Sequence, residues 1–141
     1  MIDHSLYTQI HKSMPIPCGD LVSRKNGQIL LIKRKQHPAK DQFWFPGGRI
    51  FRNESFEEAA IRLAKNEVGL TINNLKEIGT GNLKFSSDPF NHGCGTHAVT
   101  FVYSCTTTDT PLLDDNHQDY MWWDGTGDNY HQYLTQFAQK V

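Results

Sequence analysis

The chain has 141 residues, a length that fits one domain over residues 1–141 with a single hydrophobic core. Hydrophobic residues make up 38% of it, and 14 Lys and Arg nearly balance 15 Asp and Glu. This composition excludes a disordered chain and a protein that binds nucleic acid through bulk positive charge. No stretch approaches the roughly 20 apolar residues that cross a bilayer, and the first residues lack the pattern of a signal peptide. We therefore expect a cytoplasmic protein with neither nucleic acid nor a membrane among its partners.

The cysteines at positions 18, 94 and 105 are odd in number and widely spaced, with no Cys-x-x-Cys pair. Such spacing favours neither a disulfide framework nor a thiolate zinc site. We expect three reduced thiols, most of them packed in the fold.

The first predicted elements are a short helix and a hairpin. An amphipathic pattern over residues 6–10 predicts an N-terminal helix, which the prolines that follow would end. Two β-type runs at residues 21–23 and 29–32 flank Asn26 and Gly27. An Asn-Gly pair supplies the positive φ of a tight hairpin turn, so these runs are predicted to be paired strands.

The rest of the chain mixes strands with helices. Three apolar runs, at residues 75–85, 97–105 and 120–123, are rich in β-forming residues and are predicted strands. Two segments, 55–68 and 130–141, have apolar residues at helical spacing instead. Together these elements predict an α/β (α+β) fold in which a mixed β-sheet lies between α-helices.

The helix from Ser55 has a carboxylate on its apolar side. At about 100° per residue, Glu67 falls in the middle of the arc that the small and apolar residues of this helix occupy. A buried carboxylate must be paired, neutral or metal-bound, because an unpaired buried charge is very costly. Alternatively, Glu67 lies in the last turn beyond the core and its side chain remains in water.

A glycine-rich loop precedes this helix. Residues 45–49 read Phe-Pro-Gly-Gly-Arg, and residues 53–55 have the side chains of a helix start. A loop carbonyl and an inward carboxylate can together form an oxygen-rich cation site. A Pro-Gly-Gly turn is common by itself, so the interpretation as a cation site depends on its combination with Glu67.

The spacing of these residues resembles the Nudix box, the loop-helix-loop of hydrolases that cleave nucleoside diphosphates linked to another group. Gly48 is followed after five residues by Glu54, after seven more by Arg62, and then by Glu67 and Gly69 within a box over residues 48–70. The resemblance implies the Nudix fold. In this reading Glu54 and Arg62 form an ion pair that fixes the box.

One branch of the Nudix family resembles this sequence in a further feature, a box with fewer glutamates. Leu63 and Asn66 stand where two box glutamates are usual, and GDP-mannose mannosyl hydrolases share this reduced box. Members of that branch attack the anomeric carbon with inversion and form homodimers. The similarity covers most of residues 17–124, including a downstream loop with a histidine. It extends to Asp20 and to residues 30–34, 38–39, 44–49 and 115–120.

The resemblance implies a Mg²⁺ site made by the Gly47 carbonyl, Glu67 and Asn116, completed by diphosphate oxygens and water. Such hard oxygen ligands suit Mg²⁺. Asn116 replaces a glutamine of that branch and is one methylene shorter, which predicts contact through water. Alternatively, Asn116 is a turn residue of its acidic loop.

His117 resembles the general base of the same branch. The ordinary pKa of an imidazole lies near neutral pH, so it can take a proton from water without strong tuning. Inversion requires that water on the face opposite the leaving group. Alternatively, His117 is a solvated side chain, one of 7 histidines in the chain.

Three further residues are assigned to the substrate by this resemblance. Arg34 and Arg49 would neutralise charge that grows on the departing diphosphate, a task suited to the guanidinium fork. Asp20 would lie at the edge of the substrate. Alternatively, Arg34 belongs to an exposed basic run and Asp20 is a turn residue.

The sequence therefore predicts a Mg²⁺-dependent Nudix hydrolase that converts a nucleoside-diphosphate sugar, GDP-mannose or a relative, to nucleoside diphosphate and free sugar. It would act as a homodimer, by analogy with the branch it resembles. Two alternatives remain: a Nudix enzyme that cleaves at phosphorus, and a non-catalytic module that binds a nucleotide sugar.

Overall fold

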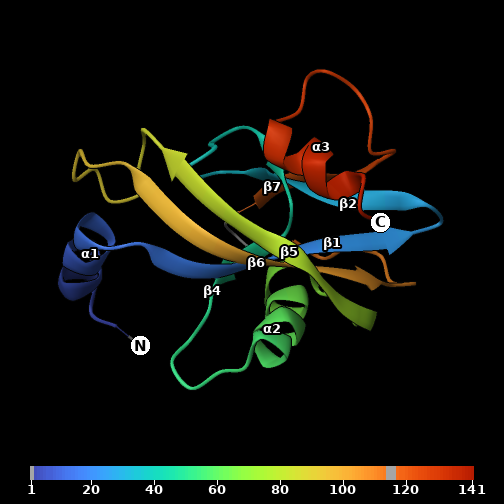
Figure 1. Ribbon diagram of the computed structural model, residues 1–141, viewed down its shortest axis with the longest axis horizontal. Helices are drawn as coiled ribbons and strands as arrows, with labels where there is room; N and C mark the ends of the chain where they lie inside the picture. The colour runs from blue at the N-terminus through green and yellow to red at the C-terminus, as the bar shows by residue number, and fades with distance from the viewer. Residues whose placement is uncertain (1, 114–116) are drawn as a thin grey trace.

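The computed structural model describes residues 2–113 and 117–141, with side chains described at all of these except 117 and 118. Within these residues, three helices surround one seven-stranded sheet (Figure 1). The elements are, in chain order, α1 (His4–Ser13), β1 (Ile16–Lys25), β2 (Gln28–Arg34), β3 (Phe43–Trp44), β4 (Gly47–Arg49), α2 (Phe56–Val68), β5 (Asn73–Phe85), β6 (Thr96–Thr106), β7 (His117–Trp123) and α3 (Gln132–Ala138).

The sheet is mixed, as predicted. Its order is β3-β2-β1-β6-β5, with β4 paired to β1 and β7 paired to β2. β1 and β6 run parallel, and the other pairs are antiparallel. Figure 1 shows α2 and α3 on opposite sides of the sheet, and α1 at one end beside the β5–β6 loop. This arrangement confirms the predicted mixed sheet between helices.

Alternate residues of the central strands enter two separate cores, because successive side chains of a strand point to opposite faces. The core under α2 contains Leu21, Leu30, Ile32, Ala60, Leu63, Ala64 and Val68. The core under α3 contains Val22, Ile29, Leu31, Trp44, Trp123, Tyr133, Leu134 and Phe137. Trp44 and Trp123 are thus core residues, and α3 is fixed to the sheet by its aromatic side chains.

α2 begins and ends as its sequence predicts. Ser55 is the N-cap and forms a capping box with Glu58, in which each side chain accepts from the other residue's backbone N–H. Gly69 ends the helix with a left-handed φ of 66°, a conformation that glycine adopts without steric cost. Asn26 and Gly27 likewise have φ of 53° and 78°, which confirms the predicted hairpin turn.

Two predictions about local structure were wrong. Residues 47–49 were predicted to be a loop, but they form strand β4, which pairs with residues 18–20 of β1. Glycine and proline obscured this strand because they are depleted in strands generally. The C-terminal helix is also shorter than residues 130–141, since α3 covers only Gln132–Ala138.

The cysteines are all free, as expected from their spacing. Cys105 is buried and Cys18 is half-buried, whereas Cys94 is exposed. Among the described residues, no helix is both long and apolar enough to cross a membrane.

Candidate active site

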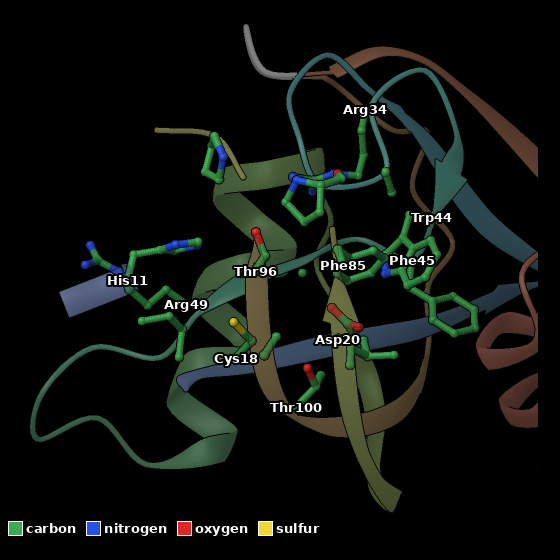
Figure 2. Close-up of a pocket in the computed structure, with 18 of the residues that line it drawn as sticks. His11, Cys18, Asp20, Arg34, Trp44, Phe45, Arg49, Phe85, Thr96 and Thr100 are labelled. Carbon is green, nitrogen blue, oxygen red and sulfur yellow. The ribbon is translucent and has the colours of Figure 1, made fainter. Parts of the chain in front are cut away.

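A pocket of about 210 Å³ lies where β1, β2 and β4 meet α1 and the β5–β6 loop. Four residues that the sequence assigned to the site line it: Asp20, Arg34, Gly47 and Arg49. They come from three strands, and the pairing of β1 with β4 places Asp20 opposite Gly47. Figure 2 shows Trp44 and Phe45 on one side of the pocket and Arg49 and His11 on the other.

Asp20 is a buried carboxylate in the wall of this pocket. Its side chain is 7% exposed, and its Oδ2 accepts a hydrogen bond of 2.7 Å from the Tyr133 hydroxyl of α3. Burial raises the pKa of Asp20 to about 6, while Tyr133, Arg34 and Trp44 oppose this rise. Because Asp20 lies within β1, its alternative interpretation as a turn residue is wrong.

Asp20 also explains the first glycine of the Gly-Gly pair. A Cβ atom at Gly47 would overlap Asp20 Oδ1 and the Gly19 carbonyl oxygen. Only glycine allows the two strands to approach this closely at the carboxylate.

Arg34 ends β2 with its guanidinium directed into the pocket. Its Nε donates to the Pro38 carbonyl at 2.8 Å. Burial lowers the pKa of Arg34, and the negative charges of Asp20 and Glu67 oppose this shift. The guanidinium stays charged, because its pKa begins far above neutral pH. The position is therefore not simply part of an exposed basic run.

Arg49 ends β4, on the α1 side of the pocket. Its guanidinium carbon lies 4.2 Å from the ring centroid of Tyr7 and 5.4 Å from that of Phe51. Its Nη1 is buried and has no hydrogen-bond partner among the described residues. A buried guanidinium nitrogen without a partner is costly, so this atom is a natural donor to an anionic ligand.

Glu54 and Arg62 form the ion pair that the box resemblance implied. Arg62 donates from Nε to Glu54 Oε2 at 2.6 Å and from Nη2 to Oε1 at 2.9 Å. The same Nη2 donates to the Arg49 carbonyl at 2.8 Å. This bidentate pair therefore fixes the backbone of Arg49 relative to α2.

Glu67 lies in the last turn of α2 and is half-buried. A Cβ atom at Gly48 would lie 3.8 Å from Glu67 Oε1 and only 2.8 Å from Leu63 Cδ2. The carboxylate is thus turned toward β4, close to Gly48. A carboxylate beside a backbone carbonyl is the donor set that Mg²⁺ prefers.

The described residues contain no group of three or more His, Cys, Asp and Glu side chains that could hold a metal ion. A cation beside Glu67 would therefore need backbone and ligand oxygens as well. Asn116, the third predicted ligand, lies outside the described residues.

His117 begins β7, and only its backbone is described. The Cα of His117 pairs with that of Arg34 across the sheet. The strand register therefore brings the His117 backbone to the Arg34 edge of the pocket.

Four of the other histidines have contacts of their own. His131 is the N-cap of α3, and its Nδ1 accepts from the Tyr133 N–H at 3.1 Å. His97 lies 2.6 Å from Asn82 Oδ1. His11 and His92 form a pair, which is considered below.

Sequence reasoning missed four residues around this pocket. Tyr7, His11 and Phe90 line it, and Tyr133 holds Asp20 from outside. Tyr7 and Tyr133 lie in segments expected to be helical, but packing against the pocket depends on long-range contacts. For Tyr133, the one available signal was a polar hydroxyl on an apolar helix face, since a buried tyrosine usually finds a partner.

Comparisons with known proteins agree with this geometry. A model of the NUDIX domain matches residues 19–125. The low-salt glycan biosynthesis protein Agl8 of Haloferax volcanii is 25% identical over 130 residues, which cover 92% of this chain and 83% of that protein. The ADP-ribose pyrophosphatase of Methanocaldococcus jannaschii is 45% identical over 56 residues, which cover 40% of this chain and 33% of that protein.

Solved structures show the same fold. The MutT NUDIX hydrolase of Burkholderia pseudomallei matches with a TM-score of 0.75 at 22% identity, over 92% of this chain and 99% of that chain. A MutT/nudix family protein of Enterococcus faecalis matches with a TM-score of 0.63 at 25% identity, over 86% of this chain and 51% of that chain.

Proposed function

Because this chain belongs to the Nudix family of hydrolases, we propose that it hydrolyses a nucleoside-diphosphate sugar, GDP-mannose or a relative, at the anomeric carbon. The products are a nucleoside diphosphate and the free sugar. The observation that carries the proposal is the meeting of Arg34, Arg49 and the buried Asp20 in one pocket beside Glu67. The pocket thus offers the positive charge of two arginines for a diphosphate and the Asp20 carboxylate for a neutral polar group.

The two arginines bind the diphosphate. Arg34 and Arg49 approach the pocket from different strands, so they can contact the two phosphates from different directions. The unpartnered Nη1 of Arg49 gains its hydrogen bond from a phosphate oxygen. Both charges then stabilise the leaving diphosphate more than the bound substrate, which is the requirement for catalysis.

Asp20 binds the sugar. A carboxylate accepts hydrogen bonds from hydroxyl groups, and Asp20 lines the pocket. Tyr133 holds Oδ2, so the carboxylate is oriented before the substrate arrives.

Glu67, the Gly47 carbonyl and Asn116 would be the protein ligands of a Mg²⁺ ion. When bound, it supplies further stabilisation of the diphosphate charge. One box glutamate suffices for this task, whereas attack at phosphorus in this family relies on a fuller set of metal-binding glutamates.

His117 takes the proton from the attacking water. The pairing of its backbone with Arg34 is consistent with a base near the diphosphate end of the sugar. Attack from the face opposite the diphosphate inverts the anomeric carbon, and no general acid is needed because the leaving diphosphate is already neutralised.

The similarity to Agl8, which is a glycan biosynthesis protein, supports a sugar-containing substrate. The similarity to an ADP-ribose pyrophosphatase favours the second candidate, cleavage at phosphorus. A non-catalytic binding module is the third candidate, and turnover with Mg²⁺ would exclude it. We further propose a homodimer, which a measurement of mass in solution would test.

Turnover in oxygen-18 water separates the first two candidates. We expect label in the released hexose, none in the nucleoside diphosphate, and an inverted first-formed anomer. Label in a phosphate, or release of a nucleoside monophosphate with a sugar phosphate, would establish attack at phosphorus instead.

A further inference from the structure

The α1 end of the pocket has a wall of aromatic side chains. Tyr7 and His11 of α1 and Phe90 of the β5–β6 loop all line the pocket. α1 lies before residues 19–125, which match the family model, so the domain model does not include this part of the wall. In Figure 2, His11 lies on the same side as Arg49, opposite Trp44.

The rings of this wall are packed against one another. The ring centroid of Phe90 lies 5.2 Å from that of Tyr7 and 5.0 Å from that of His11, the latter in an edge-to-face arrangement. Such aromatic pairs stabilise each other beyond the area they bury. The side chains of this wall are therefore in position before any ligand binds.

The loop that carries Phe90 is fixed by a single carboxylate. Asp88 accepts backbone hydrogen bonds from Phe90 at 2.9 Å, His92 at 3.0 Å and Gly93 at 3.2 Å. These charge-assisted bonds hold the loop backbone around Asp88. The backbone of Phe90 is thus fixed by its own loop, and its ring packs against α1.

His11 is held in the wall by a second histidine. His11 Nδ1 lies 2.8 Å from His92 Nε2. His92 Nδ1 in turn lies 3.0 Å from the Cys94 backbone nitrogen and 3.3 Å from Asp88 Oδ2. Burial and the neighbouring His92 lower the pKa of His11, which favours its neutral form. Because Nδ1 is engaged with His92, Nε2 is the ring nitrogen of His11 that is available to a ligand.

At the opposite end of the pocket, Trp44 is more deeply buried than Phe90. Trp44 is 6% exposed and stacks on Tyr133, with ring centroids 5.4 Å apart and an interplanar angle of 15°. Asp20 and Arg34 make that end polar. A planar apolar group of a ligand is therefore better placed against Phe90.

We propose that the wall of Tyr7, His11 and Phe90 binds the nucleobase of the substrate. Phe90 supplies the ring surface for stacking, and His11 Nε2 forms a hydrogen bond with the edge of the base. Arg49 lies between this wall and the diphosphate, against the Tyr7 ring at 4.2 Å. This inference rests on the proposed function, which makes the ligand a nucleotide, and it adds the position of the base.

Binding of GDP and of inorganic pyrophosphate, each with Mg²⁺, tests the proposal without turnover. Phe90→Leu removes the ring, so we expect the Kd for GDP to rise about 10-fold or more, whereas the Kd for pyrophosphate stays unchanged. Phe90→Tyr keeps the ring and should keep the affinity for GDP. Leu6→Ala, on an exposed position of α1 that does not line the pocket, is the matched control.

The unchanged affinity for pyrophosphate also reports that the variant is folded. If Phe90→Leu lowers the melting temperature, Phe90→Met provides a second non-aromatic replacement. The proposal is overturned if GDP binds the leucine and methionine variants as tightly as the wild type, or if GDP and pyrophosphate weaken in parallel. It is also overturned if the wild type binds GDP no more tightly than pyrophosphate. None of these results depends on which bond is cleaved, so failure here is distinct from failure of the labelled-water experiment.

Discussion

At one end of the pocket, Asp20 and Arg34 lie on strands whose backbones are fixed by pairing within the sheet. At the other end, Phe90 lies in a loop and Tyr7 lies on a helix that packs at the end of the sheet. The first end holds charged groups and is built within the matched domain. The second end holds aromatic groups, two of which, Tyr7 and His11, precede that domain.

The difference suggests a division of labour between the two ends. Charged groups that act on a reacting centre need accurate positions, and strands paired on both sides provide them. An aromatic surface for a base tolerates more variation, because stacking has a broad geometric optimum. On this view, changes at the strand end lower turnover, whereas changes at the α1 end lower affinity.

The largest effect is expected at His117. If it is the base, His117→Gln lowers kcat on the order of 10²–10⁴-fold and removes the basic-group limb of the pH-rate profile. His97→Gln is the control. A substitution of His131 would be less suitable, because His131 caps α3 and so has a structural role. An unchanged profile for His117→Gln would show that another group takes the proton.

Glu67→Gln is expected to lose activity on the order of 100-fold or more, because an amide is a poor ligand for a hard cation that stabilises the leaving group. The near-isosteric change should leave the circular dichroism spectrum as it is. Lys65→Gln, at an exposed position of the same helix, is the control. Activity near that of the wild type at limiting Mg²⁺ would show that Glu67 is not a metal ligand.

Asp20 predicts a pH dependence of stability. Its folded-state pKa, about 6, lies above its ordinary value of 3.8, so the folded protein keeps a proton that the unfolded chain has lost between these values. The unfolding free energy therefore falls as pH rises through this window. Asp20→Asn should remove this fall and, at pH 7, raise stability by about 1–3 kcal/mol, while turnover drops.

Chemical denaturation at pH 4 and pH 7 measures the difference for both proteins. The wild type and Asp20→Asn should be similar at pH 4 and should diverge at pH 7. Equal pH dependence of the two would mean that the Asp20 carboxylate is no harder to ionise in the fold than in the unfolded chain.

Local patterns were sufficient to predict most elements of the fold. The Asn-Gly hairpin and the capped helix α2 depend on neighbouring residues, so their sequences alone specify them. β4 was missed because its pairing with β1 joins residues about 30 apart in the chain, and its glycines favour a loop locally. Its geometry becomes understandable only with Asp20 in place, since that carboxylate leaves no room for a side chain at Gly47.

The candidate site was likewise predicted only in part, because long-range packing brings some of its residues together. The box residues follow a fixed spacing along the chain, so resemblance located them and the Glu54–Arg62 pair. The aromatic wall has no such spacing, because Tyr7 and Phe90 are brought together only by the packing of α1 on the β5–β6 loop. Tyr133 likewise reaches Asp20 from the far end of the chain.

The smallest effect is expected at Tyr7, which contacts both Phe90 and Arg49. Its ring lies under the Arg49 guanidinium at 4.2 Å, and a cation–π contact of this kind contributes about 0.5–1 kcal/mol. Tyr7→Leu should therefore raise KM by about 2- to 5-fold, with little change in kcat, because Arg62 still holds the Arg49 backbone. Tyr7→Phe keeps the ring and should restore KM. Unlike Phe90→Leu, Tyr7→Leu should also weaken pyrophosphate binding, since it acts through Arg49. If pyrophosphate binding is unaffected while GDP binding falls, Tyr7 serves the base alone, and the boundary between the two ends lies at Arg49 itself.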